Sequence, residues 1–304
     1  MTSPAPTVSN TTSLPDQTPF ACPIEHNGHA AVLLRLKDGS QAVVLQHGAH
    51  VVSWQAAGWD EQLYVSPLAK VEPGKAIRGG VPVIFPQFEQ RGPDTSLPRH
   101  GFARTSLWQL DVLHAQGEQA LCTMVLQDNE ATRAIWPHRF LVELTVALSP
   151  ARLDIELHIE NTDDHAWPFA AALHTYLRVS ELSQVRLQGL EGCRFIEAKD
   201  NSTHTEDHPE KRFAGHVDRI YKRVPANTLL RDSARVLTLN QETFEDLVVW
   251  NPGPELCKEM SDMPDADWAQ MLCVEAAQVA RPPLLAPGEQ WTARQSLVLP
   301  QPLR

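Results

Sequence analysis

Hydrophobic and polar residues alternate along much of this chain. The clearest run covers residues 152–160, where Leu and Ile occupy every second position and charged or polar residues the others. A period of two over nine residues predicts a strand with one buried and one exposed face. Residues 139–148 form a similar run that only three residues, 149–151, separate from the next. The two runs are therefore expected to pair as an antiparallel hairpin.

Further segments carry the same signal between turn residues. They are residues 30–36, 42–45, 51–55, 108–113, 120–126, 167–173, 236–239, 247–250, 271–276 and 291–299. Only residues 129–136 predict a short helix, with Asp128 as its N-cap. Strands do not alternate with helices, which argues against a parallel α/β sheet. The pattern predicts an all-β fold, a large antiparallel β-sandwich with a few short helices.

The strand pattern begins only after a start rich in Ser, Thr and Pro. Residues 1–20 offer little that a core could bury, so we expect a flexible N-terminal tail. No linker-like composition interrupts the segments that follow. A chain of 304 residues could hold one large domain or two ordinary ones. The unbroken β pattern favours a single domain over residues 21–304.

Composition limits the partners and the compartment. The 26 Lys and Arg stand against 37 Asp and Glu, a net charge of −11 that opposes binding to nucleic acid or to an anionic membrane. No apolar run approaches the roughly 20 residues that cross a bilayer. The five Cys are odd in number and lack a C-x-x-C pair, and the start lacks the features of a signal peptide. We expect a cytoplasmic protein and, since nothing indicates an obligate partner, a monomer.

Residues 70–104 depart from both the alternation and the acidic average. Six Lys and Arg stand against three Asp and Glu there, a local net charge of +3. An anionic ligand would need such a segment in an acidic protein. Gly79, Gly80 and Gly101 would let the backbone approach a ligand closely. Charge alone favours the other interpretation, a solvated Pro-rich loop whose arginines pair with surface acids.

Three single residues stand out as candidates for acid–base or binding roles. His174 ends an apolar run and is either a core histidine with a backbone partner or a general acid or base. Glu275 shares a strand face with Cys273, where a carboxylate is costly unless it faces a polar cavity or a partner. Asp218 either binds a ligand or forms an ion pair with its neighbour Arg219 or with Lys222.

Signatures of other enzyme classes are missing from the chain. There is no P-loop, no dinucleotide-binding glycine pattern and no Gly-x-Ser-x-Gly. The histidine pairs 26/29, 47/50 and 204/208 have no helix face to align them, so they predict no metal site.

Six motifs, taken in order, resemble the hexose-6-phosphate mutarotase branch of the aldose 1-epimerase (galactose mutarotase-like) family. They are residues 77–86 (IRGGVPVIFP), 97–104 (LPRHGFAR), 173–176 (LHTY), 217–221 (VDRIY), 249–252 (VWNP), and 273–275 (CVE) with 287–289 (PGE). The motifs span nearly all of the chain from about residue 25 onward.

The resemblance implies a β-sandwich whose concave face binds a sugar and an isomerase of hexose 6-phosphate anomers, glucose 6-phosphate foremost. It makes His174 the general acid and Glu275 the general base. The implied substrate contacts are Arg78, Arg99, His100, Arg104 and Asp218, with the arginines on the 6-phosphate. No cofactor or metal is implied.

The chemistry of anomer exchange agrees with these roles. Ring opening removes a proton from the C1 hydroxyl and delivers one to the ring oxygen, which a carboxylate and an imidazolium can do together. An anionic Glu275 would favour a charged His174, so we expect an ionised pair near neutral pH. Three alternatives stay open: a non-catalytic sugar-phosphate binder, an epimerase of unphosphorylated sugars, and a glycosidase with Asp218 as the second carboxylate.

Overall fold

The computed structural model describes residues 19–91, 94, 96–233 and 235–300. The larger of its two main sheets has nine strands and the smaller has eight. In spatial order the larger sheet contains β16 (Glu210–Arg212), β13 (Arg186–Gln188), β18 (Asn227–Arg231), β19 (Val236–Glu242), β23 (Gln290–Val298), β9 (Arg152–Asn161), β8 (Phe140–Ser149), β7 (Gln119–Gln127) and β6 (Gln109–Gln116).

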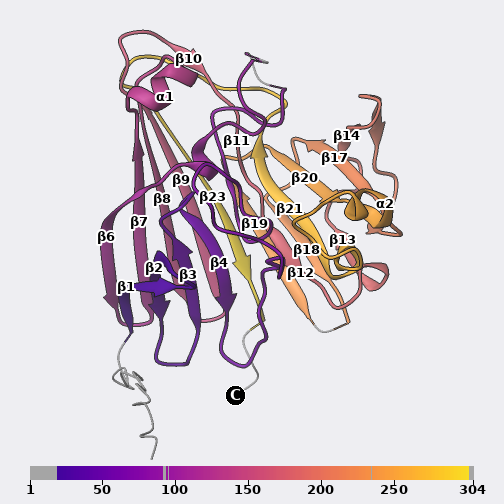
Figure 1. Ribbon diagram of the computed structural model, residues 1–304. Coiled ribbons are helices and arrows are strands. Elements are labelled where there is room, and N and C mark those ends of the chain that lie inside the picture. Colours follow the sequence, from indigo (N-terminus) through magenta and orange to yellow (C-terminus); the bar gives the residue numbers. More distant parts are fainter. Residues whose placement is uncertain (1–18, 92–93, 95, 234, 301–304) are drawn as a thin grey trace, which may run out of the picture.

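The eight-stranded sheet carries the chain segments with the sequence motifs (Figure 1). Its order is β15 (Thr203–Thr205), β14 (Arg194–Glu197), β17 (Val217–Lys222), β20 (Asp246–Asn251), β21 (Met271–Gln278), β11 (Ala171–Leu173) and β5 (Val83–Ile84), and β12 (Tyr176–Arg178) also pairs with β21. All strand pairs recorded in both sheets are antiparallel, which confirms the predicted fold class.

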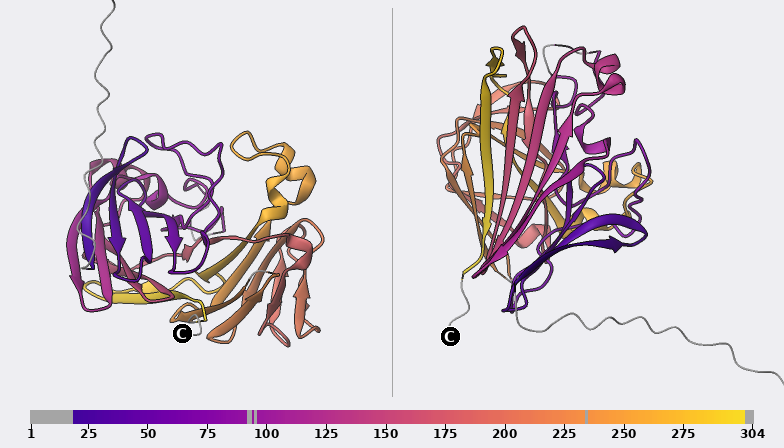
Figure 2. Two further views of the ribbon diagram at one scale, coloured as in Figure 1. Left: turned by 90° about the horizontal axis from the view of Figure 1, so that it is seen from below. Right: turned by 90° about the vertical axis from the view of Figure 1, so that its left-hand side faces the viewer.

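Two smaller sheets complete the strand structure. The first contains β1 (Phe20–His26), β2 (His29–Arg35), β3 (Gln41–Leu45) and β4 (His50–Gln55), and it lies across the lower part of the nine-stranded sheet (Figures 1 and 2). The second pairs β10 (Trp167–Pro168) with β22 (Leu284–Leu285). The α-helices are α1 (Glu130–Ile135) and α2 (Gly253–Lys258). In the described ranges no helix is long and apolar enough to cross a membrane.

Alternation in the sequence explains the central hairpin. Residues of β8 and β9 pair from Phe140–Asn161 to Ser149–Arg152, as predicted. Every second side chain of each strand is buried, and those of β9 join the main core. Phe85, next to β5, lies within 6.5 Å of five aromatic rings and links the smaller main sheet to Phe140 of β8.

Several predicted boundaries were wrong. Residues 167–173 form two short strands, β10 and β11, because the chain leaves one sheet and enters another at Phe169 and Ala170. The N-cap of α1 is Asn129 and not Asp128, since the Asn129 side chain accepts from the Thr132 N–H. Phe20 already belongs to β1, so strand structure begins inside the predicted tail, whose residues 1–18 lie outside the described ranges.

Candidate active site

All seven residues that the resemblance singled out line one cavity of about 350 Å³. They are Arg78, Arg99, His100, Arg104, His174, Asp218 and Glu275. The cavity lies against the eight-stranded sheet, and Leu256 of α2 and Met260 form part of its wall. Six separate stretches of chain thus meet at one place, although the chemical roles of these residues stay predictions.

Strand pairing brings His174 and Glu275 together. β11 and β12 flank His174 and both pair with β21, which carries Glu275. The Nδ1 atom of His174 and Oε1 of Glu275 are 3.3 Å apart. Thr175 points the opposite way, where its hydroxyl donates to the Gln295 side chain. Alternation along the strand therefore leaves the imidazole facing the cavity.

Both side chains are buried and carry polar atoms that lack a hydrogen-bond partner among the described residues. His174 is 8% exposed and Glu275 is 0% exposed. Despite the 3.3 Å approach, His174 Nδ1 and both Glu275 oxygens lack an aligned hydrogen bond within the part of the chain that the structure describes. Buried polar atoms are rarely left unpaired, so atoms of this kind on a cavity wall point to a ligand that would complete them.

Burial opposes the ionised pair that we expected. Burial lowers the pKa of His174 well below its usual value, and Arg104 and Arg78 lower it further. Burial raises the pKa of Glu275 well above its usual value, and the charge of Asp218 adds to this. Both shifts favour a neutral imidazole beside a protonated carboxyl over the ionised pair.

Arg78 enters the cavity wall next to a backbone contact that only glycine permits. Gly79 has φ +118°, and a Cβ there would lie 2.4 Å from Tyr64 O and from Val65 Cα. The Arg78 guanidinium donates from Nη1 to the Tyr176 hydroxyl at 3.1 Å.

A carboxylate from another loop also holds Arg78. Its Nε donates to the Asp262 carboxylate at 3.2 Å. Arg78 is thus pre-positioned and partly neutralised by a residue that the sequence did not single out.

A strained turn holds His100 at the cavity. His100 has φ +65°, in the left-handed region that non-glycine residues rarely occupy. Its Nδ1 accepts the Glu89 backbone N–H at 3.2 Å. This bond places the ring proton on Nε2, and burial lowers the pKa of His100, so the ring is a neutral donor. Its ring centroid is 5.8 Å from that of His174.

Arg104 and Arg99, the two other arginines of the cavity, differ in the contacts that hold their side chains. Arg104 donates from Nη2 to the carbonyl of Arg99, while its Nε has no partner among the described residues. The Arg99 side chain is 66% exposed and lies 3.3 Å from the Glu89 carboxylate. The alternative of arginines paired with surface acids therefore holds for part of this segment, including Arg91 with Glu89.

Asp218 faces the cavity and does not form the predicted ion pair with its neighbour. Arg219 instead contacts Glu197 and Glu206. Burial raises the pKa of Asp218 to about 6, with a further rise from Glu89. Asp218 therefore titrates near neutral pH.

Tyr176 is a site residue that the sequence analysis did not assign. Its ring stacks on that of His174 at 4.8 Å between centroids, and its hydroxyl accepts from Arg78. The signal was present, because Tyr176 follows His174 by two residues and must share its face of an extended chain. Asp262 gave no such signal, since only the tertiary fold brings it to Arg78.

Two cavity residues, His174 and Glu275, form a set of possible metal ligands with the buried Cys273 beside them. Ligand atoms of His174, Cys273 and Glu275 lie within 4.8 Å of one another. Burial raises the pKa of Cys273 well above its usual value, and Glu275 raises it further. Because the thiolate is the form that binds metals, this set does not favour an ion.

Comparison with known proteins identifies the family. The family model described as aldose 1-epimerase matches residues 31–298. A protein of Cenchrus ciliaris, provisionally named glucose-6-phosphate 1-epimerase, is 35% identical over 282 residues, which are 89% of this chain and 85% of the relative. A protein of Escherichia coli K12 with the same provisional name is 33% identical, over 85% of this chain and 90% of its own.

Solved structures agree. A protein of Salmonella typhimurium, provisionally named a mutarotase, has a TM-score of 0.85 and 27% identity, and covers 98% of this chain and 97% of its own. Galactose 1-epimerase from Lactobacillus acidophilus has a TM-score of 0.74 over 93% of this chain and 99% of its own, and at 14% identity it supports the fold alone. These matches confirm the resemblance noted in the sequence: the chain belongs to the aldose 1-epimerase family and is an epimerase.

Proposed function

We propose that this epimerase interconverts the α and β anomers of a hexose 6-phosphate, with glucose 6-phosphate as the foremost substrate. The observation that carries the proposal is the cavity in which His174 and Glu275 lie 3.3 Å apart. The names of the relatives at 33% and 35% identity support a phosphorylated sugar. Three guanidinium groups on the cavity wall provide the matching charge.

The proposed reaction opens and recloses the hemiacetal ring. Glu275 takes the proton of the C1 hydroxyl while His174 gives a proton to the ring oxygen, and the C1–ring oxygen bond breaks to form the aldehyde. Rotation about C1–C2 presents the other aldehyde face. The ring oxygen then attacks C1, its proton returns to His174, and the new C1 oxygen regains a proton from Glu275.

One proton shared by the pair reconciles this scheme with the neutral resting form. A protonated Glu275 beside a neutral His174 holds the same number of protons as a carboxylate beside an imidazolium. Transfer of that proton across the 3.3 Å contact converts the first form into the second. The positive charges of Arg104 and Arg78 lower the pKa of His174. An anionic phosphate bound to these arginines would offset that effect and so favour transfer of the proton to His174.

The remaining residues have binding roles in this proposal. His100 donates from Nε2 to a sugar oxygen, and the Asp218 carboxylate accepts from a sugar hydroxyl. The phosphate lies far from C1 and its charge does not change in the reaction. Contacts from Arg78, Arg99 and Arg104 therefore supply affinity, orientation and selectivity.

Anomer exchange on two sugars tests the proposal directly. Saturation-transfer NMR measures α–β exchange of glucose 6-phosphate and of free glucose at equal enzyme concentration. We expect faster exchange of the phosphorylated sugar. A higher rate on free glucose would favour an epimerase of unphosphorylated sugars, and binding without exchange would favour a sugar-phosphate binder. Release of an aglycone from an aryl glycoside would favour the glycosidase.

Replacement of Arg104 tests the phosphate role. Arg104→Ala removes a guanidinium that, among the described residues, donates to the Arg99 carbonyl and leaves Nε without a partner, so little internal structure is lost. We expect kcat/KM for glucose 6-phosphate to fall about 10-fold to 100-fold, a loss typical of a charge-assisted hydrogen bond. Exchange of free glucose should not fall, because loss of the Arg104 charge raises the pKa of His174. Lys37→Ala, at an exposed position outside the cavity, is the matched control. Equal losses on both sugars would contradict the assignment.

We also propose that residues 21–304 form a single domain and that the enzyme acts in the cytoplasm as a monomer without a cofactor. Gel filtration with light scattering tests the oligomeric state. Limited proteolysis tests the domain organisation, because a two-domain chain would yield two stable fragments.

A further inference from the structure

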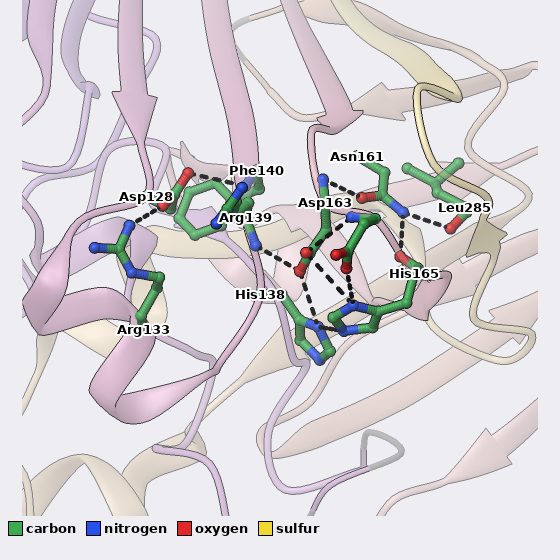
Figure 3. A network of polar contacts seen from close by, with 10 residues as sticks. Asp128, Arg133, His138, Arg139, Phe140, Asn161, Asp163, His165 and Leu285 are labelled. Atoms are coloured by element: carbon green, nitrogen blue, oxygen red, sulfur yellow. Dashed lines mark hydrogen bonds and ion pairs between the residues drawn. The ribbon is translucent and has the colours of Figure 1, made fainter.

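A second cluster of ligand-type side chains lies outside the cavity, where two loops meet. His138 belongs to the connection between α1 and β8, and Asp163 and His165 to the connection between β9 and β10. The imidazoles face each other with Nδ1 of His138 and Nε2 of His165 3.0 Å apart (Figure 3). None of the three residues lines the cavity.

The Asp163 carboxylate completes the cluster. Its Oδ2 lies 3.7 Å from His138 Nδ1, and its Oδ1 lies 3.4 Å from His165 Nδ1. The backbone N–H groups of Arg139 and Asp164 donate to it at 2.9 Å each. These two bonds hold the carboxylate in place beside both imidazoles.

The tautomer of His165 leaves a lone pair inside the cluster. Its Nδ1 lies 3.0 Å from the Asp164 carboxylate, which can only accept. A proton on Nδ1 leaves Nε2 free as an acceptor or a metal ligand. Metal-bound histidines are commonly held in this way, by a carboxylate on the other ring nitrogen.

The surrounding contacts hold both loops in place. The Asn161 side chain donates to the carbonyls of His165 and Leu285 and accepts from the Asp163 N–H (Figure 3). The ring of His138 packs against Trp136 at 4.5 Å between centroids. The His165 side chain is 53% exposed, so an ion could enter from solvent.

We propose that His138, Asp163 and His165 bind one divalent transition-metal ion of the Zn²⁺ class and thereby join the two loops. Imidazole nitrogen and carboxylate oxygen bind Zn²⁺ at about 2.0–2.2 Å, so neighbouring donors on a tetrahedral ion lie about 3.3 Å apart. The three ligand atoms already lie within 4.8 Å of one another. Closure requires a modest movement of the exposed His165 ring and a shift of the His138 ring proton to Nε2.

The donor set also indicates which ions would bind. Two imidazoles with one carboxylate suit Zn²⁺, Co²⁺, Ni²⁺ or Cu²⁺, whereas Mg²⁺ and Ca²⁺ prefer oxygen ligands throughout. Three protein ligands leave a position for water. Because the cluster shares no residue with the cavity, the ion would act as a clamp and would not take part in anomer exchange.

Metal titration of the untagged, chelator-treated full chain tests the proposal. We expect isothermal titration calorimetry to show about one Zn²⁺ per chain and no binding of Mg²⁺. His165→Ala and His138→Ala should each weaken Zn²⁺ binding at least about tenfold. His158→Ala, which removes a histidine of β9 that hydrogen-bonds to Thr292, should leave Zn²⁺ binding unchanged. Circular dichroism and Tm, both measured without metal, check that each variant is folded. If His138→Ala is unfolded, the result for His165→Ala decides the test.

Cobalt separates this site from the cysteine-containing set in the cavity. Co²⁺ bound to His138, Asp163 and His165 should show ligand-field absorption without a thiolate-to-cobalt charge-transfer band, and Cys273→Ser should not alter it. Anomer exchange should be unchanged in His165→Ala. Absence of Zn²⁺ binding, binding that survives His165→Ala, or a thiolate band lost in Cys273→Ser would each overturn the proposal and leave the His138–His165 contact as a hydrogen bond between loops.

Discussion

His174 and Glu275 are held in an environment that penalises the charged form of each. The pKa of the imidazole is lowered and that of the carboxyl is raised, both mainly by burial. Opposed pKa shifts caused by burial and by specific neighbouring charges, on groups that line a cavity, are typical of candidate acid–base sites.

The role of Glu275 can be tested without a change of shape. Glu275→Gln keeps the size of the side chain but removes the base, so we expect saturation-transfer NMR to show an about 10²–10⁴-fold loss of anomer exchange. The Tm should not fall, since a neutral amide resembles the protonated carboxyl that burial favours at this position. Glu118→Gln, in the exposed turn between β6 and β7, is the control. Near-normal exchange in Glu275→Gln would remove this residue from the mechanism.

Asp218 should confer a pH dependence on substrate affinity. Its pKa of about 6 means that the accepting carboxylate is lost as the pH falls through 6. We expect KM for free glucose to rise below that pH in the parent enzyme and to be uniformly high in Asp218→Asn. Free glucose is the better probe, because a phosphate monoester itself titrates near pH 6. An unchanged acidic limb in Asp218→Asn would assign the titration to another group.

Asp218 should also lower the free energy of unfolding above pH about 6. The pKa of Asp218 is higher in the folded chain than in the unfolded one, so the folded state binds the proton more tightly between pH about 4 and about 6. Its stabilising effect is present at low pH and is lost as pH rises to 6. Asp218→Asn should therefore raise the free energy of unfolding by on the order of 1 kcal/mol at pH 7.5, and less at pH 4.5, in urea titrations.

At the level of elements, short irregular connections position most of the site. His100 lies outside the strands, in a turn that packs against the chain at Phe85. The next residue in this turn, Gly101, has φ +67°. A Cβ on Gly101 would lie 2.1 Å from the Phe85 carbonyl oxygen. The glycine is therefore required both for its dihedral angle and for the close backbone approach that brings His100 to the cavity.

Two alanine substitutions separate these two requirements. Gly117→Ala has nearly the same φ, +62°, but nothing lies within 4 Å of its added Cβ. We expect it to cost about 1–2 kcal/mol of unfolding free energy, the left-handed penalty alone. Gly101→Ala should cost clearly more in the same urea titration and should also reduce anomer exchange. Equal costs would mean that the chain at Phe85 yields to the new methyl group.

Elements were predictable where the period of two was long and regular. β8 and β9 match their predicted ranges to within one residue, and their buried positions are those of the sequence pattern. α2 and the strands β12–β18 were not predicted. Most of these elements are three to six residues long, too short for a period to emerge, and their pairing depends on distant segments. The split of residues 167–173 was hidden for the same reason.

For the whole molecule, the core links the two main sheets through aromatic packing. Phe85 contacts Phe102, Trp136, Phe140, Trp167 and Phe169 with ring centroids 5.5–6.5 Å apart. Phe140 belongs to the nine-stranded sheet, Trp167 belongs to the two-stranded sheet, and Phe85 directly follows β5 of the eight-stranded sheet. The core next to the cavity is therefore shared by the entire sandwich and does not belong to one local unit.

Removal of this hub should destabilise the molecule as a whole. We expect Phe85→Ala to lower the unfolding free energy by about 3–5 kcal/mol and fluorescence and circular dichroism transitions to shift together. Leu107→Ala, at a residue 71% exposed, should change it by no more than about 0.5 kcal/mol. Separate transitions in Phe85→Ala would show that the two sheets unfold independently.

Alternation along the sequence was sufficient to predict the all-β class and the central hairpin, and the resemblance of its ordered motifs to the aldose 1-epimerase family indicated seven of the residues that line the cavity. The reason is that strand alternation and ordered motifs are properties of neighbouring residues. The tertiary structure alone decided the opposed pKa shifts of His174 and Glu275, the contact of Asp262 with Arg78 and the meeting of His138 with His165. Burial and charge at a site depend on residues far apart in the chain, and no local pattern encodes the distances between them.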